Sequence, residues 1–292
     1  MRRSEVPTPV TALVNRQRWL DAAGETLGRG IQAALGQLGN RQQSVRNVLH
    51  GTWLGHPLHP LLVTVPLGAW TVTLVCDALG RRRLYTAADA SLAAGLATAP
   101  FAALAGMADW TATDGTARRV GVAHALLNSL ALLLYGSSWF ARRAEARGLG
   151  QALGFAGFGV VLVSGYLGGE LVYRHRIGVD HARDDDVPAE WVPVARADTL
   201  EDGKLVRAEA AGIPVLLVRQ GETIYALGET CSHLGGPLAQ GQLVDGSVVC
   251  PWHGSRFALA DGRVLNGPAT YPVPCLMTRV REGQVEVRAA FG

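Results

Sequence analysis

Charged side chains are scarce in this sequence: Asp, Glu, Lys and Arg make up 17% of its 292 residues, against about 25% in soluble domains. Lysine is almost missing, because Lys204 is the only one. The net charge of +3 is too small to indicate a nucleic-acid partner. Hydrophobic residues make up 48% of the chain, and the mean hydropathy is +0.16. The composition therefore predicts that part of the chain does not face water.

Cysteine is also rare, with four residues in the whole chain. Cys76 falls in an apolar run, where a buried thiol behaves as a small hydrophobic group. Cys275 lies in a stretch typical of a strand. Each of the other two, Cys231 and Cys250, has a histidine close behind it. This grouping predicts metal binding and argues against a disulfide framework.

Four long stretches contain no Asp, Glu, Lys or Arg, and they cover residues 51–76, 90–108, 120–140 and 148–169. A bilayer core needs about 20 predominantly apolar residues per helix. The second stretch is the weakest, being rich in Ala and Gly with Pro100 inside it, but membrane helices tolerate both features. A buried soluble bundle is the alternative, although soluble helices are rarely uncharged around their whole circumference. The pattern predicts four transmembrane helices.

The N-terminal region precedes these stretches. The start, "MRRSEVPTPV", has an arginine pair without a following apolar core, so no signal peptide is expected. Residues 1–50 alternate apolar and polar residues near helical spacing. They predict a helix on the membrane surface or a solvated helix. Arginines flanking the spans are nearly balanced between the two sides, which leaves the orientation open.

Four spans place the start and the end of the membrane region on the same side of the bilayer. Every histidine of that region, with two carboxylates, then lies at this one face. Ionisable groups in membrane segments are candidates for function: two imidazoles could ligate a haem iron, and a carboxylate with histidines could handle the protons of a quinol. The alternative is that they lie in wet headgroups and cap helix ends. The residues are His56, His59, His124, His175, Glu170 and Asp109.

After His181 the composition changes. "ARDDDVPAEWVPV" is acidic, contains proline and has no long apolar run, which is typical of a linker. Beyond it, short β-rich runs alternate with glycine turns such as "RQGET", "ADGR" and "REGQ". They predict an all-β unit of about 100 residues.

Two cysteine–histidine pairs lie within this β unit. Cys231 and His233 form a C-x-H pair, and Cys250 and His253 form a C-x-x-H pair. Two Cys and two His could make a tetrahedral zinc site. Because each pair supplies one thiolate and one imidazole, the thiolates could instead bind one iron of a [2Fe-2S] centre and the imidazoles the other. Glycines after each pair and the lack of a following helix pattern favour the cluster.

"CSHLGG" and "CPWHGSRF" resemble the two halves of the signature of the Rieske iron–sulfur family. The resemblance implies an antiparallel β fold with a small cluster-binding subdomain. It also implies ligand roles: Cys231 and Cys250 would bind the buried iron, and His233 and His253 the outer iron near solvent.

The sequence departs from the high-potential members of that family. Their bracing disulfide is missing, because Gly236 and Trp252 or their neighbours hold the places of its cysteines. Ser255 could donate to a cluster sulfide, which would raise the potential, or bond its own loop backbone. Phe257 replaces a tyrosine hydroxyl. The resemblance implies a potential of roughly −150 to +100 mV, in the lower half of the Rieske range.

The membrane half resembles an uncharacterised bacterial family of four-helix membrane proteins with a Gly-His-Pro-x-His-Pro signature. "GHPLHPLLVTVPLGAW", "GMADW", "AHALLN" and "GGELVYRHRIGVD" carry this resemblance. It supports the architecture and adds little about chemistry.

These observations predict a multi-domain membrane protein with an all-α four-helix transmembrane bundle and an all-β Rieske fold. The expected parts are an N-terminal region (1–50), the bundle (51–181), a linker (182–190) and the Rieske domain (191–292). The expected function is membrane-anchored transfer of single electrons by one [2Fe-2S] cluster to or from a redox partner protein or the quinone pool. One alternative is an oxidoreductase, a quinol-oxidising subunit with haem b or quinone at the histidine face. The other is a redox-sensing or tethering module with a passive anchor.

The expected location is a multi-pass position in the lipid bilayer of a bacterial inner membrane. We expect the Rieske domain on the cytoplasmic side, because no export signal is visible and such clusters are assembled in the cytoplasm. No nucleic-acid partner is expected.

Overall fold

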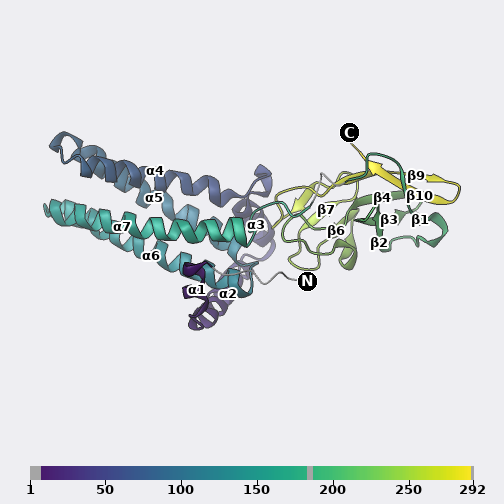
Figure 1. Cartoon of the computed structure of the whole chain (residues 1–292), viewed down its shortest axis with the longest axis horizontal. Helices are drawn as coiled ribbons and strands as arrows, with labels where there is room; N and C mark the ends of the chain where they lie inside the picture. Colours follow the sequence, from purple (N-terminus) through teal and green to yellow (C-terminus); the bar gives the residue numbers. More distant parts are fainter. Residues whose placement is uncertain (1–7, 183–186, 291–292) are drawn as a thin grey trace. The chain divides into compact units, whose positions relative to one another are not determined.

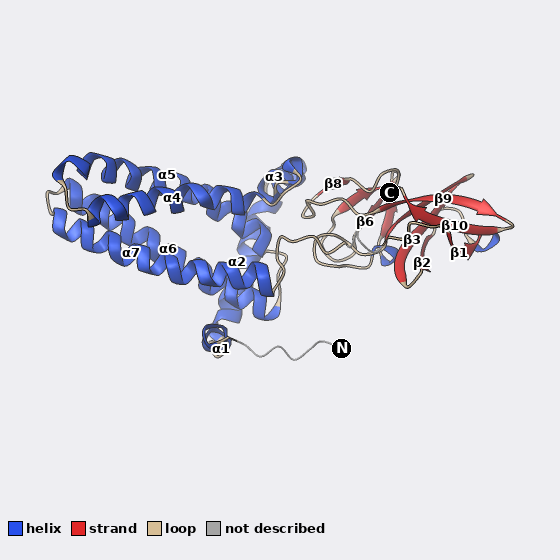
Figure 2. Ribbon diagram, turned by 45° about the horizontal axis from the view of Figure 1, so that its top comes forward, coloured by secondary structure: helices blue, strands red, loops and turns tan. Residues whose placement is uncertain are grey.

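The computed structural model describes residues 8–182 and 187–290. The chain folds into two compact units. The first combines the chain up to residue 42 with residues 58–176, and the second combines residues 43–57 with the chain from residue 177. All the long helices belong to the first unit and the strands to the second (Figure 2). The predicted combination of a helical membrane region with an all-β domain is confirmed.

Four long helices form the first unit, and each is long and apolar enough to cross a membrane. They pair as two antiparallel hairpins, the first and second helices side by side and likewise the third and fourth (Figure 1). The prediction of four apolar helices is therefore confirmed. The helices are α4 (Leu58–Ala78), α5 (Tyr85–Trp110), α6 (Gly115–Arg143) and α7 (Arg147–Gly169).

The first helix begins later than the uncharged stretch that predicted it. Gly51 and Gly55 adopt φ values of +79° and +69°, a left-handed conformation that interrupts a helix and suits glycine. The short η2 turn (Thr52–Leu54) lies between them. Low charge alone therefore did not locate the start of the helix.

An aromatic stack joins α4 to α6 in the middle of the bundle. The rings of Trp70 and Tyr135 lie 4.2 Å apart between centroids, with 18° between their planes. Tyr135 is 1% exposed. A Cβ at Gly95 of α5 would lie 2.1 Å from Trp70 Nε1, so only glycine admits the indole there. Small residues at helix interfaces allow this close packing in membranes.

A buried ion-pair network closes the end of the bundle at which both hairpins turn. The side chains of Arg142 and Asp77 are 1% and 2% exposed and are paired with each other. Arg142 Nη1 also donates to Asp89 Oδ1 at 3.1 Å, and Arg147 Nη1 donates to the same carboxylate at 2.8 Å. Buried charges are tolerated only when they are paired in this way. The sequence analysis did not predict this network.

Two N-terminal helices, α1 (Pro9–Asn15) and α2 (Trp19–Gly36), pack against α6. Arg119 of α6 donates from Nε and Nη2 to both oxygens of Asp21, at 2.5 and 2.8 Å. Leu20 lies in a small core with residues of α5 and α6. Part of the apolar surface of these two helices thus packs against the bundle.

Two antiparallel sheets make up most of the second unit (Figure 1). The larger sheet has the strand order β1-β10-β9-β4-β3-β2, and the smaller has the order β5-β6-β7-β8. Apolar side chains of the two sheets fill two adjacent cores. The strands are β1 (Val192–Arg196), β2 (Leu205–Ala210), β3 (Ile213–Gln220), β4 (Thr223–Gly228), β5 (Gln242–Val244), β6 (Ser247–Val249), β7 (Arg256–Ala258), β8 (Val264–Asn266), β9 (Cys275–Arg281) and β10 (Gln284–Ala289).

An N-terminal segment, residues 43–57, completes this β unit. It contains most of helix α3 (Gln42–His50). Asn47 Oδ1 accepts the backbone N–H of Gly267 at 2.9 Å, and Asn47 Nδ2 donates to Asn266 Oδ1 at 3.1 Å. The sequence analysis divided this segment between the N-terminal region and the first span. The structure instead joins it to the C-terminal unit, because the side-chain amide of Asn47 forms hydrogen bonds with Asn266 and with the backbone of Gly267.

The expected linker, residues 182–190, is described only in part, since residues 183–186 lie outside the described residues. The chain is held on both sides of that gap. The His181 N–H donates to Ser232 O at 2.9 Å, and the Ala289 N–H donates to Pro188 O at 2.8 Å. The described parts of this connection therefore pack on the β unit.

Candidate metal centre

Two loops of the same design carry the predicted metal ligands. The first, Cys231–Gly236, follows β4. In it the Cys231 N–H donates to Gly236 O and the Gly235 N–H donates to Cys231 O, both at 2.9 Å. Gly235 has φ +78°, which a residue with a side chain would adopt only under strain.

The second loop, Cys250–Ser255, joins β6 to β7 and repeats these contacts. The Cys250 N–H donates to Ser255 O at 2.8 Å, and the Gly254 N–H donates to Cys250 O at 3.1 Å. Gly254 has φ +77°. The two loops therefore present a cysteine and a histidine from matching turns.

The cysteine thiols are buried and close together. Cys231 is 1% and Cys250 3% exposed. A hydrogen bond from the Cys231 thiol, helped by the N–H groups of Trp252 and His253, lowers the pKa of Cys250 to about 7. The same contact, with burial, raises the pKa of Cys231. Backbone N–H groups thus face both sulfurs, as a site for thiolates requires.

The histidine rings of the two loops lie next to each other. Their centroids are 5.1 Å apart, and the ring planes are perpendicular. Burial first, and then the charges of His253, His50 and His181, lower the pKa of His233 to about 3. His233 is therefore neutral, and its buried Nδ1 has no hydrogen-bond partner. A buried ring nitrogen without a partner indicates a missing ligand.

The space between the loops fits a cluster with two iron atoms. A Cβ at Gly236 would lie 2.8 Å from Cys250 Sγ, so glycine keeps this side of the sulfur open. Among residues 8–182 and 187–290, no three His, Cys, Asp or Glu side chains are placed to hold one metal ion. Two cysteines and two histidines arranged as separate pairs are the donor set of a Rieske [2Fe-2S] centre.

Comparison with known proteins supports this reading. Residues 190–277 match the family model described as "Rieske [2Fe-2S] domain". Ferredoxin CarAc of Metapseudomonas resinovorans is 34% identical over 99 residues, which cover 33% of this chain and 92% of that protein. The chain belongs to the Rieske [2Fe-2S] family. It therefore carries a [2Fe-2S] cluster and an electron-transfer domain.

Other matches cover the two halves unequally. Residues 55–181 match the model described as "Predicted membrane protein (DUF2231)", and with the four apolar helices this makes the chain a multi-pass membrane protein. Apoptosis-inducing factor 3 of Homo sapiens is 34% identical over 117 residues, which cover 40% of this chain but only 19% of that protein. The chain thus spans about a fifth of that relative. A solved complex of oxygenase and ferredoxin in carbazole 1,9a-dioxygenase matches with 31% identity, covering 34% of this chain and 92% of that one, with a TM-score of 0.32.

The surroundings of the Rieske loops include residues that the sequence analysis missed. His50 of α3 is 2% exposed and, like His181, lies close enough to His233 to affect its charge. Both are distant in sequence from the loops, so no local motif could have pointed to them. On the other loop, Trp252 is 55% exposed and His253 is half-buried.

Ser255 ends the second ligand loop. It is fully buried, and its Oγ accepts the N–H of Ala269 at 3.0 Å. No acceptor for its hydroxyl hydrogen is found in the described part of the chain. That hydrogen therefore remains available for a cluster sulfide. Phe257, which replaces the tyrosine of the high-potential family members, is fully buried in the apolar core.

We expect Ser255→Ala to lower the midpoint potential of the cluster. A hydrogen bond to a charged group contributes about 1.5–3 kcal/mol, and for one electron this corresponds to a decrease of roughly 60–130 mV. A redox titration followed by EPR measures the change. Phe257→Tyr should have the opposite effect, since an added hydroxyl should raise the midpoint potential. An unchanged potential in Ser255→Ala would show that the hydroxyl serves only the Ala269 contact.

The membrane residues singled out from the sequence are divided between the two units. His59 Nδ1 lies 2.8 Å from Ala102 O, and His124 Nδ1 lies 2.8 Å from Ser164 O. His59 and His124 are close enough for their charges to interact. The two rings belong to different hairpins, since His59 of α4 contacts α5 and His124 of α6 contacts α7.

The other candidates have different neighbours. His56 belongs to the second unit, where its ring centroid is 6.4 Å from that of Tyr271. Glu170 begins a π-helical turn, η4 (Glu170–Arg174), and accepts the hydroxyl of Thr11 at 2.8 Å. The His175 N–H donates to Glu170 O at 3.0 Å. Asp109 lies in the last turn of α5.

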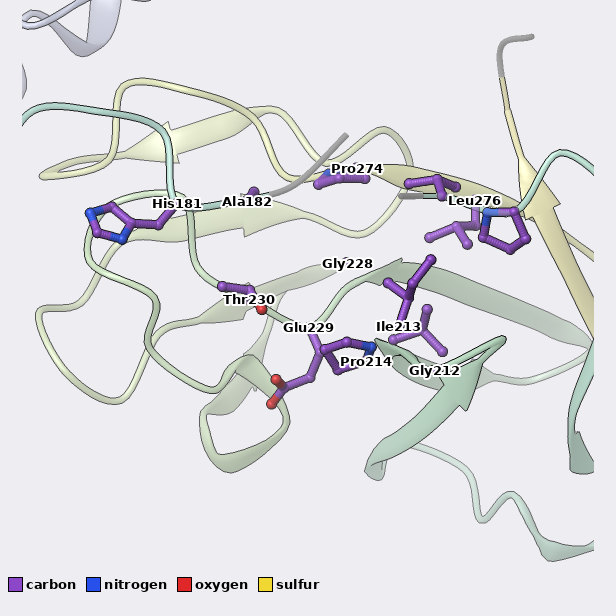
Figure 3. A pocket seen from close by; sticks show the side chains of 13 residues that line it. His181, Ala182, Gly212, Ile213, Pro214, Gly228, Glu229, Thr230, Pro274 and Leu276 are labelled. Atoms are coloured by element: carbon purple, nitrogen blue, oxygen red, sulfur yellow. The ribbon is translucent and has the colours of Figure 1, made fainter. Parts of the chain in front are cut away.

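A separate cavity of about 240 Å³ lies behind the first Rieske loop (Figure 3). Its wall is mostly apolar, built from prolines, glycines and aliphatic residues of the sheet, with Glu229, Thr230 and His181 on one side. None of the four candidate cluster ligands lines it. This cavity is therefore distinct from the metal centre.

Proposed function

We propose that this protein is a membrane-anchored carrier of single electrons whose cluster is held by Cys231, Cys250, His233 and His253. When bound, the [2Fe-2S] group accepts and releases one electron. The observation that carries the proposal is the pair of matching loops, in which two buried sulfurs face backbone N–H groups and the buried Nδ1 of His233 has no partner.

The exposure of these residues supports a direction for the electron path. Both cysteines are buried, whereas His253 is half-buried and the neighbouring Trp252 is 55% exposed. His233 is half-buried as well, and it lies close to His50 and His181. We therefore place the exchange surface on the His253 and Trp252 side, where a partner could approach the ligand ring most closely.

A redox partner protein is the partner we favour. Among the relatives is the anthranilate 1,2-dioxygenase ferredoxin subunit of Burkholderia cepacia, 32% identical with 92% of its length covered. By analogy, an oxygenase or reductase component could exchange electrons with this chain at a membrane. We place the protein in a bacterial inner membrane with its Rieske domain on the cytoplasmic side.

The visible spectrum of the detergent-purified protein tests this function. Broad iron–sulfur bands that bleach with dithionite, together with a Rieske EPR signal, are the expected result. A fully loaded, intact preparation without these bands would contradict the proposal.

A second experiment tests whether the membrane half is only an anchor, by exchanging residues 58–176 for an unrelated anchor. If the anchor is passive and the domain only senses redox state, cellular function should remain intact. An electron carrier that needs its membrane half should lose its function.

Quinol oxidation is a second candidate, favoured by an open cavity at the end of α7. The carboxylate of Glu170 lies in this cavity at a π-helical turn, a feature frequent at functional sites. In this function two clusters would be reduced per quinol, and Glu170 would accept one of the two protons released. The cavity is lined by Tyr166, Gly169, Glu170, Tyr173, Arg174 and Arg176.

Quinol-dependent reduction of the cluster distinguishes this candidate. A short-chain ubiquinol should reduce the wild-type cluster, and Glu170→Gln should slow the reduction at least tenfold. Glu145→Gln is the matched control, because Glu145 lies exposed just after α6. No reduction by quinol, or equal rates in both variants, would remove the second candidate and leave the carrier function untouched.

A further inference from the structure

The loop between β8 and β9, residues 267–274, contacts both loops that carry the candidate ligands. Ser232 Oγ, in the first ligand loop, donates to Tyr271 O at 2.6 Å. The Ala269 N–H donates to Ser255 Oγ, at the end of the second ligand loop, at 3.0 Å. Both serines and Ala269 are buried. The position of the β8–β9 loop therefore affects the orientation of a serine hydroxyl in each ligand loop.

A segment from much earlier in the chain holds the β8–β9 loop in turn. Residues 47–56, here called the clamp segment, run from α3 through η2. Asn47 accepts the N–H of Gly267 and donates to the side chain of Asn266, as described above. Gln43 Nε2 also donates to Asn47 Oδ1, at 2.8 Å. Because a backbone N–H only donates, the oxygen of the Asn47 amide must face Gly267.

The clamp segment makes two further contacts with the β8–β9 loop. Thr52 Oγ1 donates to Ala269 O at 3.4 Å, and the His56 ring lies edge-on to that of Tyr271, with 6.4 Å between centroids. A Cβ at Gly267 would lie 2.6 Å from Thr52 Oγ1, so glycine is required for this close approach. The clamp segment thus contacts Ala269 and Tyr271, the two residues whose backbone atoms bond the serines.

Most of the clamp segment lies outside both family matches. These cover residues 55–181 and 190–277, so residues 47–54 belong to neither. The segment is nevertheless part of the compact β unit. Its contacts are mainly hydrogen bonds to one loop. Hydrogen bonds require a narrow range of distance and angle, so they restrict the position of the loop more than apolar contact would.

We propose that the clamp segment positions the hydroxyl of Ser255, and that Asn47 thereby helps to set the midpoint potential of the cluster. The Ala269 N–H occupies a lone pair of Ser255 Oγ, which leaves the hydroxyl hydrogen for a cluster sulfide. A β8–β9 loop that moved would release the hydroxyl to rotate. A donor to a sulfide stabilises the reduced cluster and raises its potential. Asn47 is a positioning residue in this scheme, which rests on the proposed cluster function.

Asn47→Leu tests this role in the detergent-purified, full-length protein. Leucine is similar in size but cannot accept the Gly267 N–H. We expect a full cluster with a lower midpoint potential in a redox titration followed by EPR, and a decrease no larger than that of Ser255→Ala. When Ser255→Ala is already present, Asn47→Leu should cause no further decrease, because the hydroxyl through which it acts is gone. Asn40→Leu is the matched control, since Asn40 is exposed just before α3, and should keep the wild-type potential.

Gly267→Ala displaces the clamp segment from the side of the loop and leaves Asn47 unchanged. The added Cβ would collide with Thr52 Oγ1, so the potential should again decrease. Adding Thr52→Ala removes the colliding oxygen and should restore most of the wild-type potential. Misfolding of the Rieske domain could not produce this recovery.

Amide hydrogen exchange measures the contact without any signal from the cluster. In Asn47→Leu, peptides that contain residues 267–271 should exchange faster than in the wild type, because the loop has lost its partner. Peptides from β2 and β3 should exchange at the wild-type rate.

Three results would overturn this inference: an unchanged potential in fully loaded Asn47→Leu, decreases that add when Asn47→Leu and Ser255→Ala are combined, or unchanged exchange of residues 267–271. Loss of the cluster from Asn47→Leu and also from Gly267→Ala combined with Thr52→Ala would overturn it too, because the segment would then serve cluster assembly. A wild-type protein without a Rieske spectrum would instead contradict the electron-carrier function, and hydrogen exchange would still show whether the clamp segment holds the loop.

Discussion

Cys250→Ser is expected to abolish the iron–sulfur chromophore completely. The thiol of Cys250 is 3% exposed and faces the N–H groups of Trp252 and His253, so its thiolate is stabilised at the centre of the site. A serine hydroxyl stays protonated, and its oxygen is a hard ligand. The iron of the cluster instead binds a soft, anionic sulfur. The Rieske bands, the EPR signal and the iron and sulfide content of the purified protein should all be lost.

Cys275→Ser is the matched control. Cys275 begins β9, and its thiol donates to Ala260 O at 3.5 Å, so the variant tests the loss of one thiol from the same domain. Its iron and sulfide content should equal that of the wild type. Retention of a full cluster in Cys250→Ser would mean that a different set of side chains binds it. The ligand assignment would then be wrong.

Arg142→Met is expected to have the largest effect on the membrane unit. The change removes the arginine that pairs most closely with Asp77, whose side chain is 2% exposed. Breaking one partner of a buried ion pair costs about 3–5 kcal/mol, and Asp77 would then keep only the more distant Arg147, at 3.5 Å, as a cationic partner. Thermal unfolding in detergent should show a decrease of the melting temperature by several degrees.

Two further variants separate charge from packing. Arg142→Met combined with Asp77→Leu removes both charges and should recover much of the lost stability, since replacing a whole buried pair by apolar groups is often nearly neutral. Arg143→Met removes an exposed arginine that stacks on Trp139 at 4.4 Å and should change little. If Arg142→Met were as stable as the wild type, the pair would contribute nothing to the fold.

The sequence was sufficient wherever one short segment carries the whole physical signal. Uncharged runs of about 20 residues predict membrane helices because the bilayer core excludes charge. The two cysteine–histidine pairs predict loops because their glycines permit left-handed turns, which Gly235 and Gly254 adopt. Alternation with glycine turns was enough to predict the β unit.

Contacts between residues that are far apart in the sequence could not be predicted in this way. Asp77 and Arg142 lie just outside the uncharged runs, so each looks like an ordinary flanking charge until the bundle pairs them. Nothing local to Asn47 predicts its amide contacts with a loop of the Rieske domain.

The division of the Rieske unit into two pieces of chain has a consequence for biosynthesis. Asn47 leaves the ribosome early, but its partner Asn266 lies 219 residues further on. At synthesis rates of about 5–20 residues per second, α3 waits for at least ten seconds or so, while all four membrane helices are made. The segment that lies beside His233 can therefore dock only after translation has passed the entire bundle, which makes its docking one of the last steps in the maturation of the protein.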